Sequence, residues 1–163
     1  MTARDDLSVA LAVTKRLADK LRDVLDELAP YLPFDADRVE AVESANSLLT
    51  DAFLKRFENL VNHLQDQLWR QAAVEQGFRD PALMSRRDLA DLMEKFGLLD
   101  SADAFAEVVK TRNRLSHMYP NDPARQATRL NQACKQSAVL LAAADAAQAW
   151  AARRLSPPPP ASP

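Results

Sequence analysis

The chain has 163 residues, of which 47% are hydrophobic and 27% charged, which suits a single globular domain with its own core. Its formal net charge of −2 excludes a strong overall attraction to nucleic acid or membrane, so a polyanion could bind only at a local basic patch. The single cysteine, Cys134, excludes an intramolecular disulfide and gives no metal cluster.

The first predicted helix runs from about Arg4 to Ala29. Its apolar side recurs at alternating spacings of three and four residues, which is typical of a helix with one buried face. Pro30 and Pro33 end this helix, because proline cannot continue it. The predicted buried residues are Leu7, Leu11, Thr14, Ala18, Leu21, Leu25 and Leu28.

Residues 37–76 contain neither glycine nor proline. This stretch is expected to form one long helix or two, with Ser47 and Thr50 as candidates for the break or N-cap. Its second half has a regular apolar face. The residues of that face are Phe53, Phe57, Leu60, Leu64 and Leu68.

A loop marked by Gly77 and Pro81 follows. Ser85 and Asp88 resemble a capping box at the start of a short helix, and Gly97 is expected to end that helix.

The next helix is expected to be capped by Asp100 or Ser101 and to stop before Pro120. Asp122-Pro123 is an N-cap followed by proline at the first helical position, so a last helix should run from there to about Arg154.

These elements predict an all-α fold, an antiparallel up-down bundle of about four to six helices. Only two glycines occur, and short alternating β-branched runs are missing, which argues against a sheet. The expected organisation is one helical domain over residues 1–155 and a disordered proline-rich tail over residues 156–163. No secretion signal and no apolar run of about 18 residues is found, so we expect a cytoplasmic protein without a membrane span.

The richest chemistry lies in Arg112-Asn113-Arg114-Leu115-Ser116-His117-Met118-Tyr119. Arg112 offers a permanent cation with a fork of donors, and His117 titrates near neutral pH. Asn113 and Tyr119 add hydrogen-bonding groups. On a helical wheel these polar residues share a broad face, while Leu115 turns towards the core.

An arginine and a histidine suit phosphodiester cleavage without a metal. The imidazole of His117 can take or give the proton, and the guanidinium of Arg112 can hold the phosphate. Asn113 could orient the imidazole or contact the phosphate. One histidine serves poorly as both acid and base, and a two-fold dimer would supply a second. The same residues can also be a solvated helix face, and spacing alone leaves this open.

The octet resembles the Arg-x4-His-x-Tyr signature of HEPN-domain proteins, and especially the toxin partners of minimal nucleotidyltransferases (HEPN/MNT pairs). The segment 51–58 resembles the earlier helix of that family, which ends in Arg-Phe-Glu. The resemblance implies a HEPN-like bundle, a homodimer, and an endoribonuclease that needs no metal or cofactor. Arg112 and His117 would be catalytic and Asn113 supporting. Tyr119 would be the site of AMP transfer by the cognate antitoxin.

The resulting hypothesis is a toxin that cleaves RNA and is neutralised by a nucleotidyltransferase antitoxin. One alternative is a non-catalytic helical adaptor that binds a nucleotidyltransferase or a nucleotide through the same polar face. Another is a plain helical interaction protein in which the octet is merely solvated.

Four other chemically capable residues are expected to be structural. His63 lies between leucines and has no partner at ligand spacing, and Cys134 is expected to be a packed, inert thiol. Trp69 and Trp150 could stack on bases, but anchoring of helix packing is the simpler interpretation.

Overall fold

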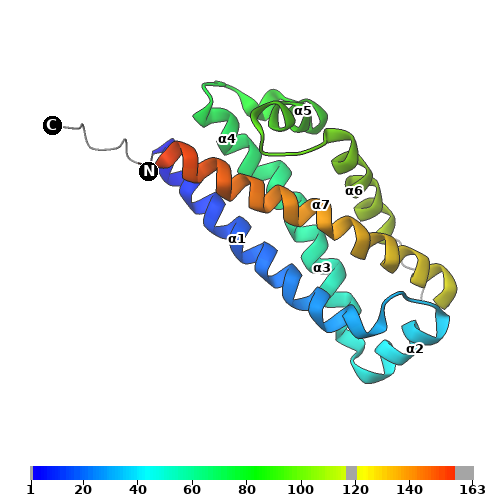
Figure 1. Cartoon of the computed structure of the whole chain (residues 1–163). Helices are drawn as coiled ribbons and strands as arrows, with labels where there is room; N and C mark the ends of the chain where they lie inside the picture. Colours follow the sequence, from blue (N-terminus) through cyan, green and yellow to red (C-terminus); the bar gives the residue numbers. More distant parts are fainter. Residues whose placement is uncertain (1, 117–120, 157–163) are drawn as a thin grey trace.

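The structure, a computed structural model, describes residues 2–116 and 121–156, and within these ranges every regular element is helical (Figure 1). The elements in chain order are α1 (Ala3–Leu28), the 3-10 turn η1 (Ala29–Tyr31), α2 (Ala36–Ala45), α3 (Ser47–His63), the π-helical segment η2 (Leu64–Leu68), α4 (Trp69–Glu75), the 3-10 turn η3 (Pro81–Leu83), α5 (Arg86–Phe96), α6 (Ala102–Leu115) and α7 (Pro123–Leu155). Because α3, η2 and α4 follow one another without a break, the described residues form six packed helices. The all-α prediction is confirmed.

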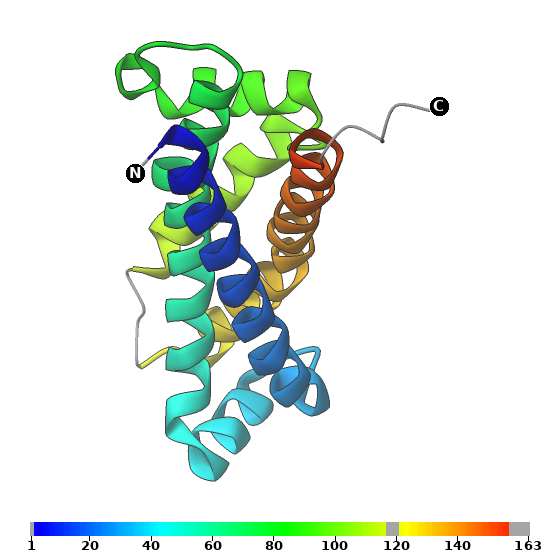
Figure 2. The same cartoon turned by 90° about the vertical axis from the view of Figure 1, so that its left-hand side faces the viewer.

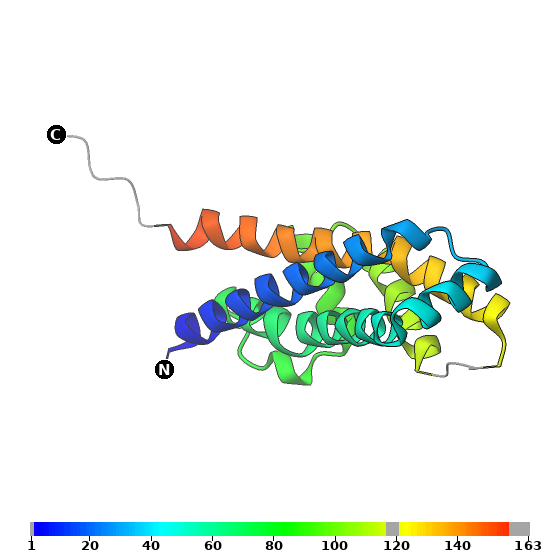
Figure 3. The same ribbon diagram turned by 90° about the horizontal axis from the view of Figure 1, so that it is seen from below.

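The long helices run alternately in opposite directions along the molecule (Figures 1 and 2). Helix α1 packs against α3, α4 and α7, and α6 packs against α7, α5 and α3. Seen from below, α1 lies between α7 and the α3–α4 helix, while the short α2 lies at one end of the bundle (Figure 3). Helix α6 therefore meets α3 on the side of α3 that α1 leaves uncovered.

The core is built from the predicted stripes. Six of the seven residues predicted to be buried in the first helix are buried, and the seventh, Leu25, is partly exposed. The residues of the predicted apolar face of the second long helix have no exposed surface. Trp69 packs against Phe105 of α6 with ring centroids 4.6 Å apart, and Trp150 is also buried. Both tryptophans are packing anchors, as expected from their position on helices.

Three helix starts and one helix end lie at predicted capping residues. The side chains of Ser85, Ser101 and Asp122 each accept a hydrogen bond from a backbone N–H three residues later. Gly97 adopts a left-handed conformation, with φ of +78°, where a side chain would be strained. Of the capping box predicted at Ser85 and Asp88, the structure shows the serine bond alone.

The break in the second long helix lies at neither of the two predicted residues. Asn46 takes an extended conformation and caps α3, its side-chain oxygen accepting from the backbone N–H of Leu48 at 3.2 Å. Ser47 is the first helical residue. Thr50 is instead buried and donates to Glu43 at 2.7 Å, which ties α3 to α2. Asparagine is as good an N-cap as serine, so composition alone did not separate the candidates.

Two predictions concern residues that the structure does not describe. The predicted proline-rich tail over 156–163, apart from Ser156, and the residues 117–120, which include His117 and Tyr119, lie outside the described ranges. Among the helices that are described, none combines the length and the apolar character needed to span a membrane.

Candidate functional site

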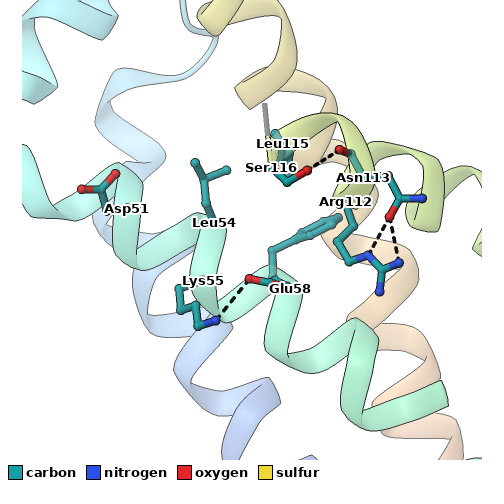
Figure 4. A pocket seen from close by; sticks show the side chains of 9 residues that line it. Asp51, Leu54, Lys55, Glu58, Arg112, Asn113, Leu115 and Ser116 are labelled. Atoms are coloured by element: carbon teal, nitrogen blue, oxygen red, sulfur yellow. Dashed lines mark hydrogen bonds and ion pairs between the residues drawn. The ribbon is translucent and has the colours of Figure 1, made fainter. Parts of the chain in front are cut away.

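A cleft of ≈ 410 Å³ lies where the carboxyl end of α6 meets α3 (Figure 4). One wall is the exposed side of α3, and the other is the last turn of α6 with the residue that follows it. The lining residues are Asp51, Leu54, Lys55, Phe57, Glu58, Arg112, Asn113, Leu115 and Ser116. The cleft is therefore lined by four of the five described residues of the predicted octet, all but Arg114, and by most of the segment 51–58.

Helix α3 presents a polar stripe to this side because of its residue spacing. Asp51, Lys55, Glu58 and Asn62 recur at intervals of four, three and four, which places them along one face of a helix. The core residues Phe53 and Phe57 lie two positions after Asp51 and Lys55, so they repeat at the same spacing on another face of the helix. Both are fully buried. The same helix therefore supplies both the core and the cleft wall.

Arg112 is held by two side-chain amides. Its Nε and one Nη donate to the Oδ1 atom of Asn113, at 3.1 and 2.8 Å. Its other Nη donates to Oδ1 of Asn62, across the interface with α3. The arginine is partly buried, and these contacts fix its planar guanidinium against both walls of the cleft.

The charge of Arg112 has no counter-ion among the described residues. Both of its partners are neutral amide oxygens, and Glu58, an acidic residue of the cleft wall, forms an ion pair with Lys55 at 3.3 Å instead. A guanidinium has five N–H donors, and three of them are used in these bonds, which leaves two. Partly buried cations are usually paired, so this arrangement can receive an anion with two acceptor oxygens.

Residues 113–116 close the end of α6. Ser116 donates from Oγ to the backbone carbonyl of Asn113 at 2.7 Å, and Arg129 of α7 donates to the carbonyl of Arg114 at 3.4 Å. Leu115 is buried, as the helical wheel predicts. The side chain of Asn113 therefore bonds to the guanidinium, while its carbonyl takes part in ending the helix.

The structure brings together part of the predicted site. Arg112 and Asn113 are in direct contact, whereas His117 and Tyr119 lie outside the described residues. Sequence reasoning missed Asn62 altogether. The sequence signal for Asn62 is the polar stripe of α3. It becomes visible only when the spacing of the polar residues in 51–62 is examined in addition to that of the apolar residues.

His63, the next residue after Asn62, has a structural environment on the side of α3 that faces α1. Its Nε2 lies 3.0 Å from both the carbonyl of Ala10 and Oγ1 of Thr14. Because a carbonyl only accepts, Nε2 carries the proton, and Thr14 is free to accept since its own hydroxyl donates to Ala10 at 2.8 Å. Burial lowers the pKa of His63 below its ordinary value, although the bond to Ala10 opposes this, so the imidazole is neutral at neutral pH.

Cys134 also fits its predicted structural role. Burial raises the pKa of its thiol to about 11, so the reactive thiolate is scarce at neutral pH. No group of three or more metal-ligating side chains comes together within the described ranges.

Comparisons of this chain with protein-family models, with curated proteins and with solved structures found no match. The site is a guanidinium held by two amides, without a carboxylate partner among the described residues, at the edge of a cleft of ≈ 410 Å³. It is suited to binding a phosphate.

Proposed function

We propose that the protein is a HEPN-like toxin of the cytoplasm, a metal-independent endoribonuclease whose partner is a nucleotidyltransferase antitoxin. The observation that carries the proposal is the guanidinium of Arg112, fixed by Asn62 and Asn113 and left with two donors and its full charge. The resemblance of the octet to the HEPN signature adds His117, five residues further along the chain, as the group that moves protons.

The proposed reaction is an intramolecular transesterification. The neutral imidazole of His117 removes the proton of the ribose 2′-hydroxyl, and the 2′-oxygen attacks the adjacent phosphorus. Arg112 stabilises the charge that develops on the equatorial phosphate oxygens. The bond from phosphorus to the 5′-oxygen breaks, and that oxygen takes up a proton, so the products are a 2′,3′-cyclic phosphate and a 5′-hydroxyl. A homodimer would supply the second His117 as the acid.

The proposed control of this activity is AMP transfer to Tyr119. An adenylyl group brings a bulky base and a phosphate charge, which would compete with RNA for the guanidinium of Arg112. Co-expression with the candidate antitoxin should raise the intact mass by multiples of one AMP, and the gain should be lost in Tyr119→Phe. An unchanged mass would leave neutralisation by simple complex formation.

The experiment that tests the activity is RNA cleavage by the purified chain in excess EDTA. Wild type should release 2′,3′-cyclic phosphate ends, and Arg112→Ala and His117→Ala should each lower the rate at least about a hundredfold. Equal rates for wild type and His117→Ala, after matched purification, would reject the proposal.

The second candidate is a non-catalytic adaptor that binds a nucleotidyltransferase or a nucleotide through the same cleft. The carboxylates of Asp51 and Glu58 on the cleft wall favour it, because they repel the backbone of a long polyanion. Its discriminator is growth: expression would not be toxic, and His117→Ala would not alter survival.

A further inference from the structure

Asn62 joins the two walls of the cleft. It lies on α3, 50 residues before Arg112, and its amide oxygen accepts from the guanidinium of Arg112 on α6. We infer that Asn62 is a positioning residue, which fixes the phosphate-binding face of Arg112 relative to α3 and so to the rest of the cleft.

The two amides that hold Arg112 fix it relative to different helices. Asn113 is its neighbour on the same helix, so the bonds to Asn113 fix the guanidinium only relative to α6. Arginine has a long side chain with much rotamer freedom, and anchoring at one wall leaves a large part of that freedom. Among the described residues, the bond to Asn62 is the one that relates the guanidinium to α3. Loss of this bond should misplace the cation and leave its charge intact.

The choice of an amide at position 62 also matters for charge. A carboxylate there would accept the same hydrogen bond and would form an ion pair with Arg112, which would cancel the attraction for phosphate. An apolar residue would leave the guanidinium anchored to α6 alone. Asparagine offers a neutral amide oxygen, so it can hold the guanidinium without adding a negative charge that would offset the positive one.

The catalytic consequence of this inference rests on the proposed ribonuclease activity. The test compares Asn62→Ala, Asn62→Asp and a matched control, Asn59→Ala, which makes the same change one turn earlier on α3 at a partly exposed residue with no hydrogen bond to Arg112. Thermal unfolding followed by circular dichroism checks that each variant is folded.

The expected kinetic result is a split between kcat and KM. Asn62→Ala should lower kcat about 10- to 100-fold, the loss that follows a small misplacement of a catalytic group, with KM within about threefold of wild type. Asn62→Asp should restore much of kcat and raise KM about tenfold, because the new carboxylate competes with phosphate. Asn59→Ala should match wild type. If Asn62→Ala keeps the wild-type kcat while Arg112→Ala is inactive, Asn62 has no positioning role and the proposed function still holds.

If the purified chain does not cleave RNA, the proposed function is overturned, but the positioning role of Asn62 can still be tested by a second measurement. The Nη–H signal of Arg112, the group that donates to Asn62, is assigned as one lost in Arg112→Lys and is followed by nuclear magnetic resonance in the full chain. In Asn62→Ala it should shift and exchange faster with water, while in Asn59→Ala it should stay in place. An Arg112 signal that is the same in wild type and Asn62→Ala would overturn the inference.

Discussion

Asn62 and His63 are consecutive residues of α3 that contact two different neighbouring helices. His63 bonds to Ala10 and Thr14 of α1, and every group in that contact is neutral and satisfied. Asn62 bonds to Arg112 of α6, whose positive charge finds no counter-ion among the described residues. Both side chains are partly buried polar groups at a helix interface. The two contacts therefore differ in charge balance more than in residue type. The neutral contact of His63 is structural, whereas the contact of Asn62 leaves a positive charge that can bind an anion.

The largest expected difference between the Arg112 contact and the His63 contact comes from replacing Arg112 by an apolar residue of similar length. Arg112→Met should lower RNA cleavage at least about a hundredfold, yet its free energy of unfolding should equal that of wild type or exceed it by up to about 1 kcal/mol. The reason is that a partly buried, unbalanced cation contributes little to folding. Urea unfolding and cleavage assays measure both. A loss of stability greater than about 1 kcal/mol would make Arg112 a structural residue like His63.

The reverse pattern is expected at His63. His63→Ala should lower the free energy of unfolding by about 2 kcal/mol, because the hydrogen bonds to α1 and the packing of the ring are lost. RNA cleavage should stay within about twofold of wild type. Gln67→Ala, at an exposed residue one turn further on, serves as the control and should change stability by less than about 0.5 kcal/mol. Loss of cleavage in a folded His63→Ala protein would show that the two sides of α3 are coupled.

The lowered pKa of His63 predicts a smaller, pH-dependent effect. Above pH 6.5 the imidazole is neutral in both the folded and the unfolded chain, so its contribution to stability is complete. As the pH falls below 6.5, the unfolded chain binds a proton before the folded chain does, and the stability declines until the folded-state pKa is passed. The urea midpoint of wild type should therefore fall more than that of His63→Gln between about pH 7.5 and pH 5.5. Parallel curves would contradict the burial of His63.

The smallest predicted effect is on the charged wall of the cleft. Glu58→Gln removes one negative charge near the proposed phosphate site and should lower KM in the proposed RNA cleavage about twofold to threefold, since one exposed charge acting through water contributes about 0.5 kcal/mol. The effect should shrink at high salt, because exposed charges are screened. A KM that rises in Glu58→Gln would mean that this carboxylate contacts the substrate favourably.

Most of the fold could be predicted because the helix signals are local. The apolar stripes and the capping residues Ser85, Gly97 and Ser101 each depend on neighbours a few residues away. Asn46 was missed because several good N-caps occur close together, and the choice among them depends on how α2 packs against α3. The π-helical segment also depends on tertiary packing.

Less of the candidate site could be predicted, for a physical reason. Arg112 and Asn113 are adjacent in sequence and could be found as a motif, whereas the contact with Asn62 joins residues 50 positions apart. No local pattern reports which face of α3 lies opposite the last turn of α6. The polar stripe of α3 narrows the choice to one face but does not select Asn62 within it.

The π-helical segment η2 sets the relative phase of two parts of one long helix. The buried residues Leu60, Leu64, Leu68 and Ala72 are each four apart, and in a regular α-helix such a series drifts by about 40° at every step. The wider turn of η2 absorbs the drift, so that α4 keeps Trp69 in the core while Asn62 still faces α6. Removing a single residue between 64 and 68 would turn one part by about 100° relative to the other. The chain length across this segment is therefore under geometric constraint: an insertion or deletion there would separate Asn62 from Arg112 without changing either residue.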